Sequence, residues 1–164
     1  MPSSYLDSVP PIVHTIIGLA PRRVLDVGPG WSKYGLMCRE YLPGLRWIDA
    51  VEVPTGRKPI QDQVYDHIFE IDARRFKGWK PYDLILLIDV IEHMSKEDGH
   101  ALVRSMLAAG TSVLVSTPKV FVEQHDDHNP HETHICLWAW DEFYTYNVTV
   151  DASTVDSIIY VLDN

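Results

Sequence analysis

The fold of this chain is decided by the stretch Val24-Leu25-Asp26-Val27-Gly28-Pro29-Gly30-Trp31-Ser32-Lys33-Tyr34-Gly35. An apolar run ends at an acid, a glycine-rich turn follows, and residues 33–41 have the composition of a helix. This order is typical of the strand, turn and helix that begin a nucleotide-binding βαβ unit. Because Gly28 and Gly30 lack a Cβ atom, the backbone can turn sharply there, and a ligand can approach it beside the free N–H groups of the helix.

Asp26 changes the kind of ligand that the turn predicts. Turns that bind dinucleotides usually follow an apolar strand end and carry a third glycine, whereas here an acid lies beside the turn and Lys33 takes the third-glycine position. A carboxylate suits a ligand with an ammonium group better than it suits a pyrophosphate. S-adenosylmethionine carries such a group on its methionyl part. The alternative is a plain strand-to-helix turn that binds no ligand.

Length and composition predict one domain over residues 1–164, with an N-terminal segment and helix over residues 1–20. The net charge is −9 and no basic run stands out, which argues against a strong intrinsic nucleic-acid footprint. Cys38 and Cys136 are too few for a disulfide framework, and the sequence begins without a signal-peptide pattern. The apolar run at 84–88 is too short to span a bilayer. We therefore expect a cytoplasmic protein with no membrane partner.

Seven apolar segments predict strands, and most of them alternate with helical segments. The expected strands are 22–27, 46–53, 67–71, 84–88, 112–116, 148–151 and 157–162. The expected helices are 9–19, 33–41 and 96–108, with short ones at 61–66 and 141–144. The continuous apolar run at 84–88 is what a parallel strand covered on both faces requires. The alternation predicts an α/β fold with a doubly wound, Rossmann-like, mostly parallel sheet and a closing hairpin.

Four of the expected strands end in an acid: Asp26, Glu52, Asp72 and Asp89. Ligands of open α/β sheets bind beyond the carboxyl ends of the strands, so we expect these side chains to converge there. Glu52 is placed to accept hydrogen bonds from both hydroxyls of a ribose, and Asp72 to accept one from an adenine amino group. The alternative is that each acid simply closes a strand and begins a loop.

Several motifs resemble those of class I S-adenosylmethionine-dependent methyltransferases, over nearly the whole chain from Arg22 to Phe143. The matching pieces are Val24 to Gly30, Asp49-Ala50-Val51-Glu52, Tyr82 to His93 and Val113 to Pro118. Within the class, the chain is most similar to small bacterial and phage members, which share a Gly-Lys-Tyr-Gly-like helix start and an Asn-Pro-x-Glu-x-His loop. The counterparts here are Ser32-Lys33-Tyr34-Gly35 and Asn129-Pro130-His131-Glu132-Thr133-His134.

The resemblance implies a sheet of seven strands with the last one inserted antiparallel. It also implies that S-adenosylmethionine binds and S-adenosylhomocysteine is the product, with the glycine turn at the methionyl part and Asp89 near the sulfonium. The cofactor-binding residues that it implies are Asp26, Gly28, Pro29, Gly30, Tyr34, Glu52, Val53, Asp72, Ala73 and Asp89. Two departures matter. Ser32 replaces a glycine common in this turn, and the absence of an added substrate domain leaves loops, or a second subunit of a homo-oligomer, to meet the methyl acceptor.

Residues 119–136 form a long polar loop in which histidines recur every three residues. These are His125, His128, His131 and His134, with Asp126, Asp127 and Glu132 among them. A loop of this length inside a compact domain is usually functional. Imidazoles and carboxylates are common metal ligands, but the spacing matches no closed zinc pattern, so we expect no metal site. The remaining alternatives are an active-site lid that supplies a base, and a plain solvated loop.

His134 is the catalytic candidate in this loop because it holds the position that resembles the family's loop, and Trp138 follows at helical spacing to anchor the segment. Asp89 is the second candidate for accepting a proton. Glu92 and His93 form a further pair, although the same run in this class often only leads into the next helix. We expect the loop to close over the site of methyl transfer.

The sequence therefore predicts a small methyltransferase that passes a methyl group to an acceptor of unknown class by direct displacement. The first alternative is a catalytically inactive protein of the same fold, which binds the cofactor or serves in an assembly. A nicotinamide oxidoreductase is disfavoured by Asp26 and Lys33 in the glycine turn.

Overall fold

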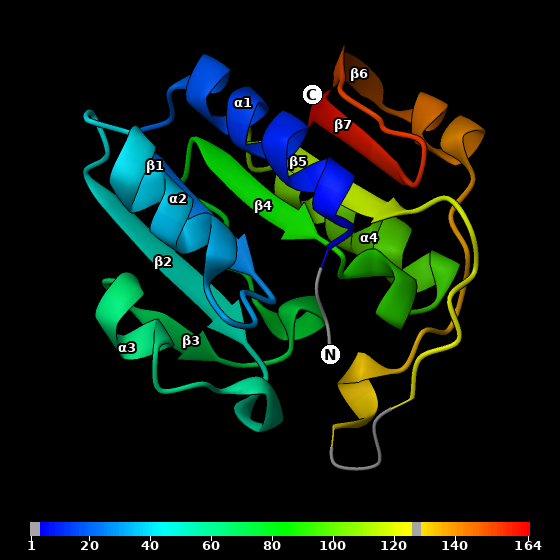
Figure 1. The fold of residues 1–164 in the computed structure, drawn as a ribbon, viewed down its shortest axis with the longest axis horizontal. Helices are drawn as coiled ribbons and strands as arrows, with labels where there is room; N and C mark the ends of the chain where they lie inside the picture. The colour runs from blue at the N-terminus through cyan, green and yellow to red at the C-terminus, as the bar shows by residue number, and fades with distance from the viewer. Residues whose placement is uncertain (1–3, 126–128) are drawn as a thin grey trace.

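The computed structural model describes residues 4–125 and 129–164 (Figure 1). Asp126, Asp127 and His128 of the histidine loop lie outside the described residues, as do residues 1–3. One twisted sheet runs through the middle of the molecule, and helices cover both of its faces (Figure 1). None of the helices within the described residues is both long enough and apolar enough to cross a membrane.

The sheet has seven strands in the order β3-β2-β1-β4-β5-β7-β6. Their bounds are β1 Arg23–Val27, β2 Trp47–Glu52, β3 Ile68–Glu70, β4 Leu84–Ile88, β5 Ser112–Pro118, β6 Asn147–Asp151 and β7 Ser157–Asp163. The pairs from β3 across to β5 are parallel, whereas β7 runs antiparallel to both β5 and β6. This arrangement confirms the predicted doubly wound sheet, with its antiparallel last strand and closing hairpin.

The helices form one layer on each face of the sheet (Figure 1). Their bounds are α1 Val9–Leu19, α2 Lys33–Tyr41, α3 Gln61–Val64 and α4 Lys96–Leu107. α1 and α2 bury Ile12, Ile16 and Cys38 against one face, and α4 buries Leu102 and Met106 against the other. Because β4 is covered on both sides, its side chains are apolar whichever way they point.

Local side chains set the ends of these helices. The Ser95 hydroxyl accepts a hydrogen bond from the Asp98 N–H at 3.1 Å and so caps the start of α4. α1 ends at Leu19, as predicted, and Ala20 closes it in a left-handed conformation with φ 47°.

The strand order places a topological switch point between β1 and β4. The crossover after β1 leads to β2 on one side, whereas β4 lies on its other side. The carboxyl ends of these parallel strands meet at one edge of the sheet, where ligands of such folds bind. The fold therefore brings the acids after β1, β2 and β4 to the same edge.

Candidate functional site

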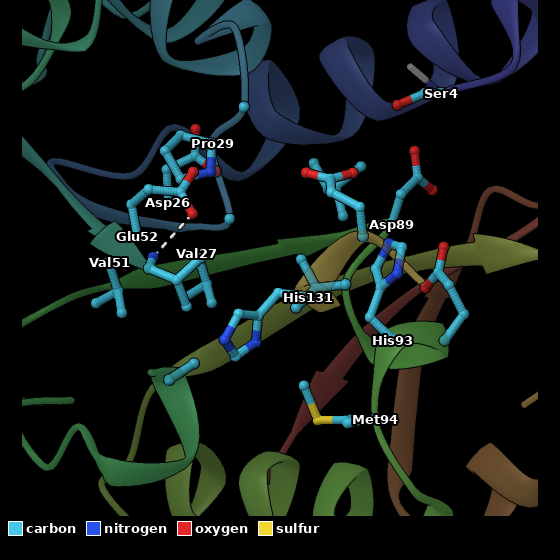
Figure 2. A pocket seen from close by; sticks show the side chains of 18 of the residues that line it. Ser4, Asp26, Val27, Pro29, Val51, Glu52, Asp89, His93, Met94 and His131 are labelled. Atoms are coloured by element: carbon cyan, nitrogen blue, oxygen red, sulfur yellow. Dashed lines mark hydrogen bonds between the residues drawn. The ribbon is translucent and has the colours of Figure 1, made fainter. Parts of the chain in front are cut away.

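A cavity of about 590 Å³ lies at this edge, within the usual size range of small-molecule sites (Figure 2). Every residue that the sequence proposes for cofactor binding or catalysis lines it, namely Asp26, Gly28, Pro29, Gly30, Tyr34, Glu52, Val53, Asp72, Ala73, Asp89 and His134. Figure 2 shows Asp26 and Glu52 at one side of the cavity, and Asp89 and His93 at the other.

The glycine turn between β1 and α2 presents its backbone to the cavity. Gly28 and Gly30 have φ values of 66° and 50°, in the left-handed region that glycine enters without strain. A Cβ atom at Gly28 would lie 2.9 Å from Cγ2 of Val90, so glycine also permits the close approach of the loop after β4. Ser32 has a φ of 66°, which shows that the position where a glycine is common keeps a glycine-like conformation.

Asp26 ends its strand in a buried position and has one defined partner. Its side chain is 3% exposed, and its Oδ2 accepts a hydrogen bond from the Tyr65 hydroxyl at 2.6 Å. Gly35 makes room for this tyrosine, because a Cβ there would lie 2.4 Å from the hydroxyl oxygen. Burial raises the pKa of Asp26 to about 7, the Tyr65 hydrogen bond opposes this shift, and the charge of Glu52 adds to it.

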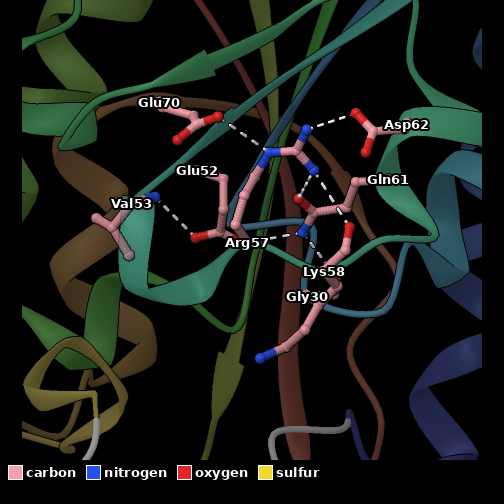
Figure 3. A network of polar contacts seen from close by, with 8 residues as sticks. All are labelled: Gly30, Glu52, Val53, Arg57, Lys58, Gln61, Asp62 and Glu70. Carbon is pink, nitrogen blue, oxygen red and sulfur yellow. Dashed lines mark hydrogen bonds and ion pairs between the residues drawn. The ribbon is translucent and has the colours of Figure 1, made fainter.

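Glu52, at the end of β2, is tied to the glycine turn (Figure 3). Its Oε1 accepts the Val53 N–H at 2.8 Å. Gln61 Nε2 donates to the Gly30 carbonyl at 2.9 Å and lies 3.4 Å from the other oxygen of Glu52. The Arg57 guanidinium in turn donates a hydrogen bond to Gln61 Oε1 at 3.1 Å. Burial raises the pKa of Glu52. The hydrogen bonds from Val53 and Gln61 fix the orientation of this buried carboxyl group.

Asp72 differs from the other strand-end acids because an arginine already engages it. Its Oδ1 accepts the Arg74 N–H at 2.9 Å, and the Arg74 guanidinium pairs with its Oδ2 at 2.5 Å. The side-chain hydrogen bond with Arg74 lowers the pKa of Asp72, which is therefore ionised at neutral pH. The side chain lines the cavity, but an adenine amino group would have to share it with Arg74.

Two further acids follow β4 on the opposite side of the cavity. Asp89 adopts a φ of 53°, which is unusual for a residue with a side chain, and accepts a hydrogen bond from the Ser116 hydroxyl at 3.3 Å. Glu92 is 2% exposed, and its Oε2 accepts a hydrogen bond from the Thr117 hydroxyl at 3.2 Å. Burial raises the pKa of both carboxyl groups, and the charge of Asp89 raises the pKa of Glu92 further.

Two histidines from distant parts of the sequence face each other beside these acids. The ring centroids of His93 and His134 are 4.7 Å apart, with an angle of 66° between the ring planes. His93 Nδ1 lies 3.1 Å from the Thr133 carbonyl oxygen, which can only accept, so Nδ1 carries the hydrogen. Burial lowers the pKa of His93 to about 4, so its imidazole is neutral at pH 7.

Hydrogen bonds anchor the end of the histidine loop against the segment after β4. The His134 N–H donates to the Gln124 carbonyl at 3.2 Å, and the next residue, Ile135, donates its N–H to the Glu92 carbonyl at 2.8 Å. Trp138 is 1% exposed and donates its Nε1–H to the Ile91 carbonyl at 3.0 Å. Trp138 therefore anchors the segment, as the sequence predicts.

The described histidines of the loop do not share one environment. His131 and His134 line the cavity, whereas His125 Nδ1 lies 3.2 Å from the Thr133 hydroxyl. His128 is outside the described residues, so the structure does not test a role for it.

Sequence reasoning missed the residues that hold the acids in place. Tyr65 and Gln61 come from α3 and its C-terminal end, and they reach acids on β1 and β2. Ser4, in the N-terminal segment, also lines the cavity and accepts a hydrogen bond from the Tyr34 hydroxyl at 2.9 Å. None of these residues belongs to a motif, and only the short helix predicted at 61–66 marks the segment that two of them occupy.

No protein-family model and no curated protein matches this sequence. Solved structures do match. An O-methyltransferase family protein from Burkholderia thailandensis has a TM-score of 0.67 at 15% identity, over 96% of this chain and 56% of that protein. The methyltransferase domain of bacterial CtHen1-CN has a TM-score of 0.67 at 19% identity, over 96% of this chain and 98% of the domain. Human N-acetylserotonin methyltransferase, in complex with SAM, has a TM-score of 0.68 at 13% identity, over 97% and 53% of the two chains.

This chain thus spans about half the length of the Burkholderia and human proteins, and nearly all of the bacterial domain. At identities below 20%, these matches show a shared fold and not a shared activity. The seven-stranded order and the antiparallel β7 agree with these matches. The chain therefore has the fold of class I S-adenosylmethionine-dependent methyltransferases.

Proposed function

We propose that this protein is an S-adenosylmethionine-dependent methyltransferase that acts on an acceptor yet to be identified. One observation carries the proposal: the four acids Asp26, Glu52, Asp72 and Asp89, each predicted from its own strand end, line the same cavity as the glycine turn. On a fold shared with methyltransferases, this arrangement offers a negatively charged, partly buried wall around a cavity large enough for a nucleoside cofactor.

The residues present fit this cofactor. The Gly28 backbone approaches the loop after β4 so closely that a Cβ would meet Val90 at 2.9 Å, and the turn from Gly28 to Gly30 lines the cavity. Asp26 is a buried carboxyl group whose pKa is raised by burial. A cationic ligand group beside Asp26 would relieve that penalty, because an opposite charge favours the ionised form.

Each residue of this wall has a proposed role. Asp26 and the turn from Gly28 to Gly30 would hold the amino-acid part, with Tyr34 beside it. Glu52 would accept hydrogen bonds from the ribose hydroxyls, and Asp72 would accept one from the adenine amino group. Asp72 can accept this hydrogen bond in addition to those from Arg74, because each carboxylate oxygen has two lone pairs. The remaining wall residues Pro29, Val53 and Ala73 would pack against the cofactor.

When bound, S-adenosylmethionine would supply an electrophilic methyl group for an acceptor's lone pair, and the electron pair of the carbon–sulfur bond would stay on sulfur. The chain's own contribution is to align the two molecules and to exclude water from between them. Asp89 lies across the cavity from Glu52, and His134 lines the cavity beside His93 (Figure 2). Asp89 and His134 are the groups proposed to take a proton from the acceptor. The loop that carries His134 is proposed to close over the acceptor.

Calorimetric titration with S-adenosylmethionine, S-adenosylhomocysteine and NAD tests the proposal. We expect both adenosyl ligands to bind one to one and NAD not to bind, and we expect Asp26→Ala to weaken the binding. Absence of heat with either adenosyl ligand, for a folded protein, would overturn the proposal. Binding without turnover of any candidate acceptor would favour an inactive, cofactor-binding protein instead.

A further inference from the structure

Glu92, His93 and His134 form a compact group on the cavity wall, named here the Glu/His cluster. One ligand atom from each residue lies within 4.8 Å of the other two. All three residues line the cavity, where the two histidines are half-buried and Glu92 is buried. The cluster brings together the segment after β4 and the end of the histidine loop, which are far apart in the sequence.

One oxygen of the cluster is left without a partner. Glu92 is 2% exposed, and Thr117 satisfies its Oε2 at 3.2 Å. Its Oε1 is buried and has no hydrogen-bond partner within residues 4–125 and 129–164. Buried carboxylate oxygens are nearly always satisfied, because leaving one without a partner is costly. An unsatisfied oxygen beside two imidazoles therefore points to a missing positive group.

The histidines present nitrogen atoms of the right kind. The Thr133 carbonyl accepts the Nδ1–H of His93 at 3.1 Å, which leaves the lone pair on Nε2. A backbone carbonyl on the far nitrogen is the usual way to fix the tautomer and orientation of a metal-binding histidine. His134 lies across from His93, with its ring 4.7 Å away.

Contacts with the backbone on both sides of His134 hold the three residues of the cluster next to one another. Thr133 bonds to His93 on one side of His134, and on the other side the Ile135 N–H donates to the Glu92 carbonyl at 2.8 Å. His134 is thus clamped between two contacts with the other members of the cluster. Prepositioned donors of this kind lower the entropic cost of binding an ion.

We propose that Glu92, His93 and His134 bind one divalent first-row transition-metal ion at the acceptor side of the cavity. Two imidazoles and one carboxylate form a donor set typical of zinc and iron sites that keep open positions, and imidazole disfavours magnesium and calcium. Donors at about 2.0–2.2 Å from one tetrahedral ion lie about 3.3–3.6 Å apart. The three ligand atoms here lie within 4.8 Å of one another, so small side-chain rotations would close the set. The sequence predicts no metal because the loop's histidine spacing fits none, but this cluster takes only one histidine from the loop.

The site also narrows the class of acceptor, an inference that rests on the proposed methyl transfer. With three protein ligands, the ion would keep at least one position open to the cavity, where an oxygen of the acceptor can bind. A bound divalent ion lowers the pKa of a hydroxyl group and orients it. The acceptor would then be a hydroxyl compound whose proton passes to water, and His134 would act as a ligand and not as the base.

Titration of the metal-free protein with cobalt(II), followed by visible absorption and then by competition with zinc, tests the site. We expect one cobalt ion per chain. Glu92→Gln and His134→Ala should weaken binding about 100-fold or more, and Thr117→Val, which removes the partner of the ligating carboxylate, about 10-fold. His131→Ala is the matched control, because this histidine lines the same cavity outside the cluster and its loss should leave the affinity unchanged.

Three results would overturn the proposal: no saturable uptake of cobalt or zinc by folded protein, unchanged affinity in both Glu92→Gln and His134→Ala, or equal weakening in His131→Ala. The metal titration needs no cofactor, so the two proposals can fail separately. Cofactor binding without metal uptake removes only the metal site. Metal uptake without cofactor binding supports the site and removes the methyltransferase proposal.

Discussion

The two ends of the cavity are built differently. At one end, named here the turn end, the carboxyl groups of Asp26, Glu52 and Asp72 each accept a hydrogen bond from another group of this chain. At the other end, the histidine end, Glu92 keeps one buried oxygen without a partner among the described residues. The imidazoles of His93 and His134 face each other, and each has a nitrogen within 4.8 Å of a Glu92 carboxyl oxygen.

The two ends therefore differ in how far their acidic side chains are already hydrogen-bonded before a ligand binds. The turn end is complete within the chain, so its acids keep their orientation whether or not a ligand is bound, which is the arrangement that favours recognition of a fixed shape. The histidine end is incomplete within the chain, because a buried carboxylate is stable only when something compensates it. Recognition is therefore expected at the turn end, and chemistry at the histidine end.

His134→Ala should separate the two ends most strongly. We expect methyl transfer to fall by about 10²–10⁴-fold, the usual effect of removing a group that moves a proton or activates the acceptor. The cofactor dissociation constant should change by less than about 2-fold, because His134 packs against His93, which lies across the cavity from Asp26 and Glu52 (Figure 2). Single-turnover kinetics and calorimetry on the same preparation measure the two effects. Intact turnover in this variant would place the chemistry elsewhere.

The pH dependence of stability provides the second test, at the turn end. Burial raises the pKa of Asp26 to about 7, against about 3.9 in an unfolded chain. Between these values the folded protein binds a proton that the unfolded chain has released, so the free energy of unfolding falls as pH rises. This stabilisation is fully present below pH about 4 and is lost as pH rises through 7, with a total of up to about 4 kcal/mol.

Asp26→Asn is the matched variant for this measurement. Its amide oxygen can still accept the Tyr65 hydrogen bond, but it cannot ionise. Urea unfolding at several pH values between 4 and 8 should give a flatter profile than that of the unchanged protein. If both proteins lose the same stability over this window, Asp26 is not the group that titrates.

Glu52 tests recognition directly. Glu52→Ala should weaken cofactor binding by about 1.5–3 kcal/mol, the usual value of hydrogen bonds to a charged group, and Glu52→Gln should weaken it less because one acceptor oxygen remains. Glu70→Gln is the control, since Glu70 pairs with Glu52 across β2 and β3 but is exposed and does not line the cavity. Unchanged calorimetric affinity in both Glu52 variants would remove it from the site.

The turn end could be predicted from the sequence because its signals are local. Each acid lies at or near the carboxyl end of an apolar strand, and parallel strands necessarily bring these ends to one edge. The seven strands and the antiparallel last strand also followed from local patterns together with a resemblance. What the sequence did not reveal at this end are the partners of the acids, such as Tyr65, because they come from a short helix with no motif of its own.

The histidine end could be predicted only in part. His134 was proposed from its place in the loop, but Glu92 and His93 resembled a plain entry to the next helix. Their role depends on contacts with Thr133 and Ile135, which lie about forty residues later and leave no periodic trace in the sequence. The spacing of the loop histidines pointed away from a metal, because spacing describes only ligands from one segment.

The smallest effect is expected at Ser32, in the turn that begins the turn end. Its φ of 66° costs a residue with a side chain about 1–2 kcal/mol, whereas glycine enters this region freely. Glycine also gains about 0.5–1 kcal/mol of freedom in the unfolded chain, so Ser32→Gly should raise the free energy of unfolding by less than about 1 kcal/mol. Ser105→Gly, in the last turn of α4, should instead lower it by up to about 1 kcal/mol, because no strain is relieved there. If the two variants lose stability equally in urea unfolding, contacts of the buried Ser32 side chain hold the turn, and its backbone conformation is not a source of strain.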